Sequence, residues 1–131
     1  MRRISPLIRN GRGAASVELA LTLPVFLLIL FGVVETGHVV WMKAAIQSGA
    51  QQAARCSAIG SSSCATVSAT QAYAAARSYG LNPSASVFTV TTPSCGKQVD
   101  ASYVYRSPVS AIIPYNFTLT AKSCYPIAPT S

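Results

Sequence analysis

Carboxylates and imidazoles, the side chains that most enzymes use for proton transfer, are scarce in this chain of 131 residues. It contains three acidic residues and one histidine. The three carboxylates, Glu18, Glu35 and Asp100, lie far apart in the sequence, and acid–base catalysis usually needs His or paired carboxylates at one substrate. A Gly-x-Ser-x-Gly nucleophile motif is also absent. The composition therefore disfavours an enzyme, and we predict no catalytic site, metal site or cofactor.

Gly13 and Glu18 have a spacing that has a chemical use. If a peptidase cuts after Gly13, the new N-terminus is the amine of Ala14, and Glu18 becomes the fifth residue of the mature chain. In a helical filament this amine can face the Glu18 carboxylate of a neighbouring subunit. The pair neutralises two charges that hydrocarbon would otherwise penalise. If such a cut occurs between Gly13 and Ala14, the spacing gives Glu18 an assembly role.

An apolar stretch follows this motif. Sixteen uncharged residues, LALTLPVFLLILFGVV, separate Glu18 from Glu35. The distance from Arg12 to Trp41 is about 43 Å at helical rise, close to a bilayer with its headgroups. Four arginines precede the stretch and place the N-terminus in the cytoplasm by the positive-inside rule: Arg2, Arg3, Arg9 and Arg12. We therefore predict one transmembrane segment over about 14–41 in the lipid bilayer, with Trp41 at the outer interface.

The positive charge of the chain does not predict a nucleic-acid partner. The formal net charge is +7, and the four arginines of the basic head account for most of it. From residue 14 onward there are six basic and three acidic residues, a difference of +3, and the basic residues are spread singly. A nucleic-acid footprint is normally a clustered patch or stripe. No nucleic acid is expected as a partner.

Two other interpretations of the apolar stretch remain open. One is a cleaved secretory signal, but the residues after the stretch, VVETGHVVW, contain no Ala-x-Ala site. The other is an unprocessed single-pass anchor that carries a periplasmic binding domain. Neither explains Glu18, because a carboxylate within an apolar membrane helix costs about 2.5–3.5 kcal/mol on insertion scales.

The N-terminal third of the chain resembles the corresponding region of TadE-like proteins. These are minor pilins, or pseudopilins, of the tight-adherence (Flp-type) pilus system. The resemblance covers residues 12–58 and rests on four features: Gly13 with Glu18, the Leu23–Pro24 step, FGVVE at 31–35 and the small-residue run that ends AAR at 53–55.

The resemblance implies that a dedicated prepilin peptidase cleaves between Gly13 and Ala14. It also implies that Glu18 is the partner of the new N-terminal amine. Flp-type major pilins place an aromatic residue after this glutamate, whereas the present chain has Leu19. This difference favours a minor pilin, whose further partners are other pilin and minor pilin subunits and the inner-membrane assembly platform.

Pro24 and Glu35 each allow a structural and a functional interpretation. Pro24 lacks a backbone donor and clashes with the preceding turn, which predicts a helix kink, and membrane helices tolerate such kinks. The kink is either purely structural or a soft point that helps the helix repack from bilayer into filament. Glu35 is either a solvated residue at the outer boundary or a contact to a neighbouring subunit.

The periodicity predicts that the helix continues beyond the membrane. Apolar and small residues recur at intervals of four, three and four: Ile46, Ala50, Ala53 and Ser57. The predicted helix spans 14–58, with a transmembrane half and a periplasmic half. A face of small residues (Ala45, Gly49, Ala53) allows close approach of another helix, either from a second subunit or from the distal domain of this chain.

The remaining residues predict an α+β fold. Residues 65–79 are rich in alanine and precede Gly80, which suits a short second helix with a glycine at its C-cap. Three later segments are rich in β-branched and aromatic residues: 86–92, 98–106 and 115–123. We predict a small antiparallel sheet with a hairpin turn at 93–96, packed on the C-terminal half of the long helix. Phe117, Leu119 and Ala121 should share one face of it.

The four cysteines predict disulfides. Cys56, Cys64, Cys95 and Cys124 all lie on the exported side and lack a zinc spacing. An even number in an oxidising compartment indicates two disulfides, for which three pairings exist. We favour Cys56–Cys64, which closes the turn between helices, and Cys95–Cys124, which joins two strand ends. A domain of about 73 residues has a small core and benefits from such cross-links.

These expectations divide the chain into three parts. Residues 1–13 are a basic prepilin leader, 14–58 the long helix, and 59–131 a small exported α/β domain. The resemblance implies a minor pilin that takes part in assembly or initiation of a type IV pilus. It is expected in the bacterial inner membrane with its C-terminal domain in the periplasm. Incorporation into an extracellular pilus stays open.

Overall fold

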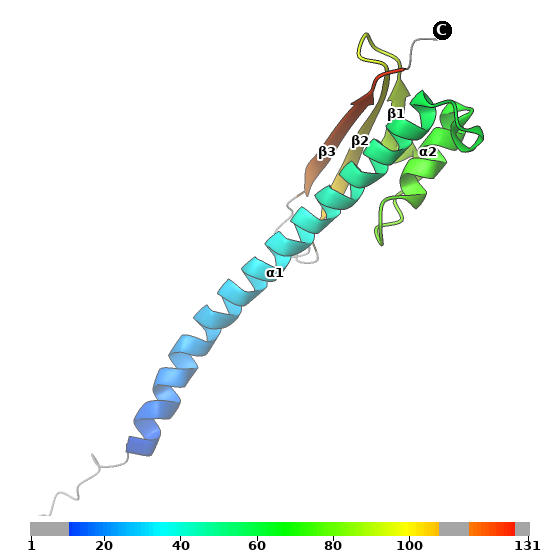
Figure 1. Ribbon diagram of the computed structural model, residues 1–131. Coiled ribbons are helices and arrows are strands. Elements are labelled where there is room, and N and C mark those ends of the chain that lie inside the picture. Colours follow the sequence, from blue (N-terminus) through cyan, green and yellow to red (C-terminus); the bar gives the residue numbers. More distant parts are fainter. Residues whose placement is uncertain (1–10, 108–115, 128–131) are drawn as a thin grey trace, which may run out of the picture. The chain divides into compact units, whose positions relative to one another are not determined.

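The computed structural model describes residues 11–107 and 116–127 (Figure 1). Residues 1–10, most of the predicted leader, lie outside this description. Contacts divide the chain into a first unit, Met1–His38, and a second unit, Val39–Ser131. The division falls within helix α1, which contributes residues to both units.

Helix α1 extends from Gly11 to Ala58, which confirms the long N-terminal helix. About half of its residues are strong helix formers, and two of its threonines donate to carbonyls of the preceding turn. Thr22 Oγ1 donates to the Glu18 carbonyl at 3.0 Å, and Thr36 Oγ1 donates to the Gly32 carbonyl at 2.8 Å. Pro24 lies inside the helix, and the kink expected there remains a prediction.

Helix α2 extends from Val67 to Ala76, shorter than the predicted 65–79. It begins late because Thr66 is its N-cap and accepts from the Ala69 N–H at 3.1 Å. The preceding residues form the 3-10 turn η1 (Ser62–Cys64). It ends early because Arg77 is the C-cap. Gly80 is therefore not the cap that we predicted, and its φ of +75° belongs to the next turn.

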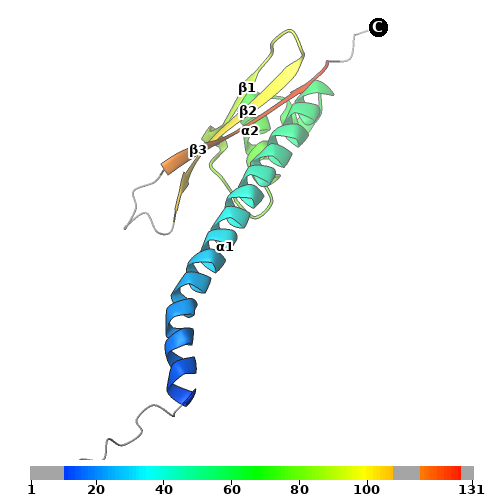
Figure 2. The same ribbon diagram turned by 90° about the vertical axis from the view of Figure 1, so that its left-hand side faces the viewer.

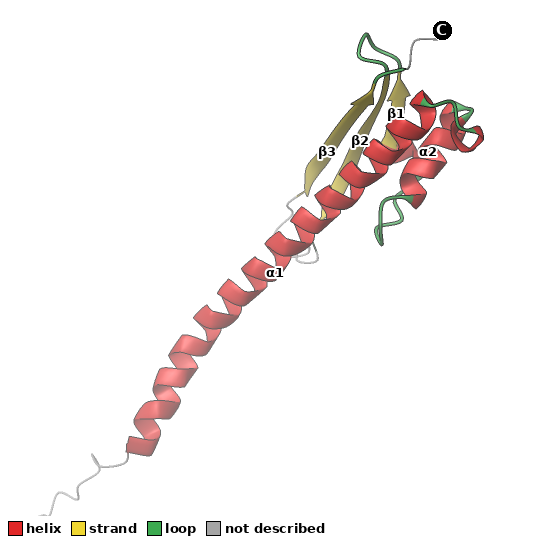
Figure 3. Cartoon of the chain, viewed as in Figure 1, coloured by secondary structure: helices red, strands yellow, loops and turns green. Residues whose placement is uncertain are grey.

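Three antiparallel strands form one sheet in the order β1-β2-β3 (Figure 3). They are β1 (Phe88–Thr91), β2 (Lys97–Arg106) and β3 (Asn116–Tyr125). The predicted first strand, 86–92, is too long, because residues 85–87 form the 3-10 turn η2 (Ala85–Val87). The predicted hairpin turn is present, since the Gly96 N–H donates to the Pro93 carbonyl at 3.0 Å.

The core of the second unit lies between one face of the sheet and both helices (Figure 2). Leu119 and Ala121 are buried in it and Phe117 packs against it, which confirms the predicted alternation in β3. Its largest fully buried apolar side chains are Phe88, Ile46 and Val99. The C-terminal part of α1 therefore belongs to the folded domain rather than only supporting it.

The small-residue face of α1 packs against α2 of the same chain. A β-carbon built on Gly49 would lie 2.5 Å from the Ala74 carbonyl oxygen and would also meet Ser78 Oγ. Ser78 is buried and donates to the same Ala74 carbonyl at 2.9 Å. Of the two partners that the sequence left open, the chain's own distal domain occupies this part of the face.

Both edges of the sheet receive a glutamine from a helix. Gln71 Nε2 of α2 donates to the Phe88 carbonyl of β1 at 2.6 Å. Gln47 Nε2 of α1 donates to the Lys122 carbonyl of β3 at 3.1 Å. Both carbonyls belong to edge strands, which have a neighbouring strand on one side only, so each glutamine adds a donor to an edge of the sheet.

Two disulfides are present, as predicted, and they have the favoured pairing. Cys56–Cys64 joins the end of α1 to η1, with Cα atoms 5.9 Å apart. Cys95–Cys124 joins the hairpin turn to the end of β3, with Cα atoms 6.4 Å apart. The first bond closes a short local loop, and the second links segments 29 residues apart.

Candidate functional site

The N-terminal part of α1 exposes a continuous apolar surface in the first unit. Thirteen large apolar side chains between Val17 and Val34 are exposed, with Leu28 at 73% and Phe31 at 67%. Among the described residues, α1 is the one helix long and apolar enough to cross a membrane, and the most apolar part of it is not buried at all. Soluble monomers rarely expose patches of more than a few hundred Å².

The free energy gained by removing this apolar surface from water is large, so we expect other molecules to bury it. Full burial of one such side chain stabilises by roughly 1.5–3 kcal/mol. For the thirteen partly exposed side chains, removal from water is worth on the order of 10–20 kcal/mol. Lipid or the helices of other subunits can supply this cover, and either fits a single-pass membrane anchor.

Glu18 is the one carboxylate within this apolar surface. Its side chain is exposed, and in the described parts of the chain it has no hydrogen-bond or ion-pair partner. Thr22, one turn later, donates to the Glu18 backbone carbonyl and not to the carboxylate. A charge in this position is expensive in hydrocarbon.

Gly13 has no structural reason to be glycine. It lies in the first turns of α1, its φ is not positive, and a β-carbon built on it would meet nothing within 4 Å. Ala14 beside it is exposed. A glycine that the fold does not need is consistent with recognition by another protein, although cleavage between Gly13 and Ala14 remains a prediction.

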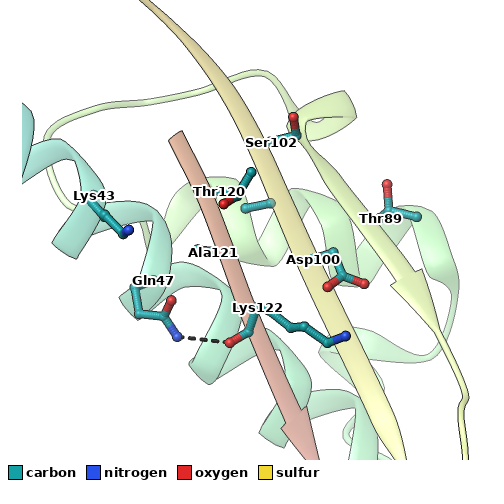
Figure 4. Close-up of a pocket in the computed structure, with 9 residues that line it drawn as sticks. Lys43, Gln47, Thr89, Asp100, Ser102, Thr120, Ala121 and Lys122 are labelled. Atoms are coloured by element: carbon teal, nitrogen blue, oxygen red, sulfur yellow. Dashed lines mark hydrogen bonds between the residues drawn. The ribbon is translucent and has the colours of Figure 1, made fainter. Parts of the chain in front are cut away.

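The second unit contains an open cavity that the sequence did not predict (Figure 4). Its volume is about 450 Å³, and its lining includes residues of α1 and residues on the outer face of the sheet, which is the face away from the core. Nine residues line it: Lys43, Gln47, Thr89, Asp100, Ala101, Ser102, Thr120, Ala121 and Lys122. Strand alternation could have placed Asp100 and Lys122 on this outer face, but only the register sets them opposite each other.

The chemistry available in this cavity is limited. Asp100 accepts from Gln98 Nε2 at 2.6 Å, and Figure 4 shows the Lys122 side chain extending over β2 on the same side as the Asp100 carboxylate. Opposite charges at facing strand positions stabilise a sheet modestly. Asp100 is the only carboxylic side chain of the second unit. Among the described residues there is no group of three metal-binding side chains.

Comparison with known proteins decides which of these features belong to a family. Residues 13–55 match the family of TadE-like proteins. The match is consistent with a TadE-like protein of the Tad pilus system. No curated protein and no solved structure matches the chain.

The segment that matches the TadE-like family covers both the exposed part of α1 and the part that packs in the second unit. It includes Gly13, Glu18 and Pro24 and the exposed apolar surface, and it continues through the part that packs against the sheet. It ends at Arg55, before the first cysteine. The second helix, the sheet and both disulfides therefore lie outside the region that the family defines.

Proposed function

We propose that this protein is a minor pilin, or pseudopilin, that takes part in assembly or initiation of a tight-adherence type IV pilus. The match of residues 13–55 to TadE-like proteins supports the pilus system. One structural observation carries the finer assignment. Among the thirteen exposed large apolar side chains between Val17 and Val34 lies one carboxylate, Glu18, without a partner in the described chain.

The proposed mechanism begins at the cytoplasmic face of the inner membrane. A prepilin peptidase removes the basic leader after Gly13, which takes away the arginines that hold the N-terminus in the cytoplasm. The new amine of Ala14 then pairs with the Glu18 carboxylate of a neighbouring pilin subunit. Because both charges are otherwise unpaired in hydrocarbon, the pair sets the register between subunits. An inner-membrane assembly platform would supply the neighbouring helices.

The same proposal assigns the topology. The chain spans the inner membrane once, with the N-terminus in the cytoplasm and the disulfide-bonded second unit in the periplasm. The disulfides fit an oxidising compartment. Its role is structural, with the TadE-like helix as the element that contacts other pilin and minor pilin subunits.

The N-terminal residue and the intact mass of the membrane-extracted protein, measured without reductant, test this proposal. We expect a chain that begins at Ala14 and is lighter by four hydrogens than the reduced sequence, since each disulfide removes two. A chain that still begins at Met1 in cells with the matching peptidase would overturn it. The protein would then be an unprocessed membrane anchor with a periplasmic binding domain.

The Gly13→Val variant makes the test specific. Because a side chain at position 13 meets nothing in the fold, this variant should fold normally, keep its leader and fail to support piliation. Gly37→Val is the matched control, since Gly37 lies in the same helix and also has open space around it. Normal piliation in Gly13→Val would contradict the proposal.

A further inference from the structure

Trp41 is held by a loop that is distant in sequence. A β-carbon built on Gly80 would lie 3.0 Å from Cζ2 and 3.2 Å from Cη2 of Trp41, so the benzene edge of the indole rests on Gly80. Trp41 nevertheless remains 45% exposed. The contact brings the chain just after α2 next to the residue where the apolar stretch ends.

The path of α2 explains this contact. The Cys56–Cys64 disulfide turns the chain at the end of α1, and Gly49 then faces Ala74 and Ser78. Helix α2 therefore runs back along α1, as Figure 1 shows, and the loop after it reaches Trp41 through Gly80. Residues 77–82 are thereby placed at the end of the second unit where α1 enters it.

This loop has a defined conformation and presents an aromatic side chain. The Leu81 N–H donates to the Ser78 carbonyl at 3.1 Å, and the Leu81 side chain packs against the core. Gly80 and Asn82 both have positive φ, 75° and 42°. Tyr79 lies between Ser78, which is buried, and Leu81 in the sequence, and its side chain is 60% exposed. A turn anchored on both sides thus holds a tyrosine outside the core.

We propose that Trp41, Tyr79 and Lys43 form a membrane-contacting rim that seats the second unit on the lipid headgroups. Trp and Tyr prefer the membrane–water interface, because one end of each ring system is apolar and the other is polar. Lys43 is exposed two residues after Trp41, and its ammonium group suits lipid phosphates. The inference rests on the proposed membrane anchoring of α1.

The exposed apolar side chain beside Trp41 favours lipid as the occupant. Val40 lies directly before Trp41 and is 63% exposed, so the rim begins next to an apolar side chain that the second unit does not bury. A helix alone leaves the attached domain free to tilt. A second contact through Tyr79, 38 positions away in the sequence, restricts the orientation in which the domain meets other subunits.

Fluorescence can test the rim because Trp41 is the only tryptophan of the chain. The full-length wild type and the double variant Trp41→Phe/Tyr79→Trp are reconstituted in phosphatidylcholine–phosphatidylglycerol vesicles. Some vesicles contain lipids brominated near the glycerol. In both proteins bromination should lower the indole emission by about two-fold or more, because an interfacial ring lies within contact of these positions.

Trp41→Phe/Tyr125→Trp is the matched control. Tyr125 is also exposed, at 39%, but it is the last residue of β3, and Figure 1 shows that β3 ends near the C-terminal end of α1. Its replacement should show almost no quenching. Intact mass without reductant verifies that each variant retains both disulfides.

The outcomes separate this inference from the proposed function. Quenching of wild-type Trp41 and of the Tyr79→Trp indole, but not of the Tyr125→Trp indole, would establish the rim. Quenching of Trp41 without quenching at position 79 would overturn the rim and leave the membrane anchor intact. If wild-type Trp41 is not quenched either, both the anchor and the rim are wrong.

Discussion

Single residues in α1 serve two surfaces that have opposite requirements. In the first unit, Gly13 and Gly37 have open space around them, and side chains such as Leu28 face outward. In the second unit, Gly49 lies against the backbone of α2, and a β-carbon there would meet the Ala74 carbonyl. The fold therefore has room for a side chain in place of glycine at positions 13 and 37 but not at position 49.

Gly49→Ala should destabilise the second unit by about 1–3 kcal/mol, because the added methyl overpacks the contact with Ala74 and Ser78. Thermal unfolding in detergent, followed by circular dichroism, measures the loss. Gly37→Ala is the control and should be neutral or slightly stabilising, since alanine is the better helix former. Equal stability of the two variants would mean that α1 and α2 are not packed this closely.

Glu18→Gln should abolish incorporation into pili while leaving the second unit folded. The amide keeps the size and the hydrogen-bonding capacity of the side chain but removes the charge that the Ala14 amine would pair with. Pilus shearing followed by mass spectrometry measures incorporation. Leader cleavage should persist, because the variant retains Gly13. A variant that assembles like the wild type would show that Glu18 is not the amine's partner.

Elements of the second unit are joined at the edges of the sheet by side chains of the helices. Gln71 is partly buried and bonds to the Phe88 carbonyl, whereas the bond from Gln47 to the Lys122 carbonyl is exposed. Water can replace an exposed donor, but a carbonyl shielded from water stays unsatisfied. Gln71 should therefore contribute more than Gln47 to the stability of the second unit.

Gln71→Met should destabilise the second unit by about 1–2 kcal/mol, since methionine fills similar space but leaves the Phe88 carbonyl without its donor. Gln47→Met should lower stability by less than about 0.5 kcal/mol, as expected for exposed positions. Denaturant unfolding of both variants compares them under one condition. A larger loss of stability in Gln47→Met than in Gln71→Met would show that the Lys122 carbonyl, and not the Phe88 carbonyl, is the one shielded from water.

At the scale of the whole molecule, the two units are stabilised in different ways. The first unit depends on what surrounds its helix, because no other part of the chain that the structure describes buries its apolar side chains. The second has its own core, drawn from α1, α2 and the sheet. That core is small, and the disulfides Cys56–Cys64 and Cys95–Cys124 supplement it by limiting the unfolded chain.

Replacing each disulfide by paired alanines should lower the stability of the second unit by an amount that depends on the length of the loop that the disulfide closes. Loop-closure entropy predicts a loss of about 3.5 kcal/mol without Cys95–Cys124 and about 2.5 kcal/mol without Cys56–Cys64. The free energy of unfolding in detergent, measured for both variants, gives the order. A greater loss for the shorter loop would show that the local contacts of Cys56 and Cys64, both buried, outweigh chain entropy.

Patterns between near neighbours in the sequence were sufficient to predict most of the secondary structure and the presence of two disulfides. The apolar run and its basic flank predicted the long helix, β-branched segments predicted three strands, and an even number of cysteines predicted two disulfides. The resemblance seen over residues 12–58 agrees with the TadE-like match at 13–55. These features depend on local propensity and composition, which can be recognised in a sequence without knowledge of the tertiary contacts.

Contacts between distant residues were decided only by the fold. No local pattern shows that Gly49 faces Ala74, that Gly80 supports Trp41 or that Gln71 reaches Phe88. The ends of α2 were mispredicted for a different, local reason, because Thr66 caps its start and Arg77 caps its end within the alanine-rich run. Packing of α2 along α1 sets each of these contacts at once, and such packing depends on the shapes of surfaces that come together only when the chain has folded.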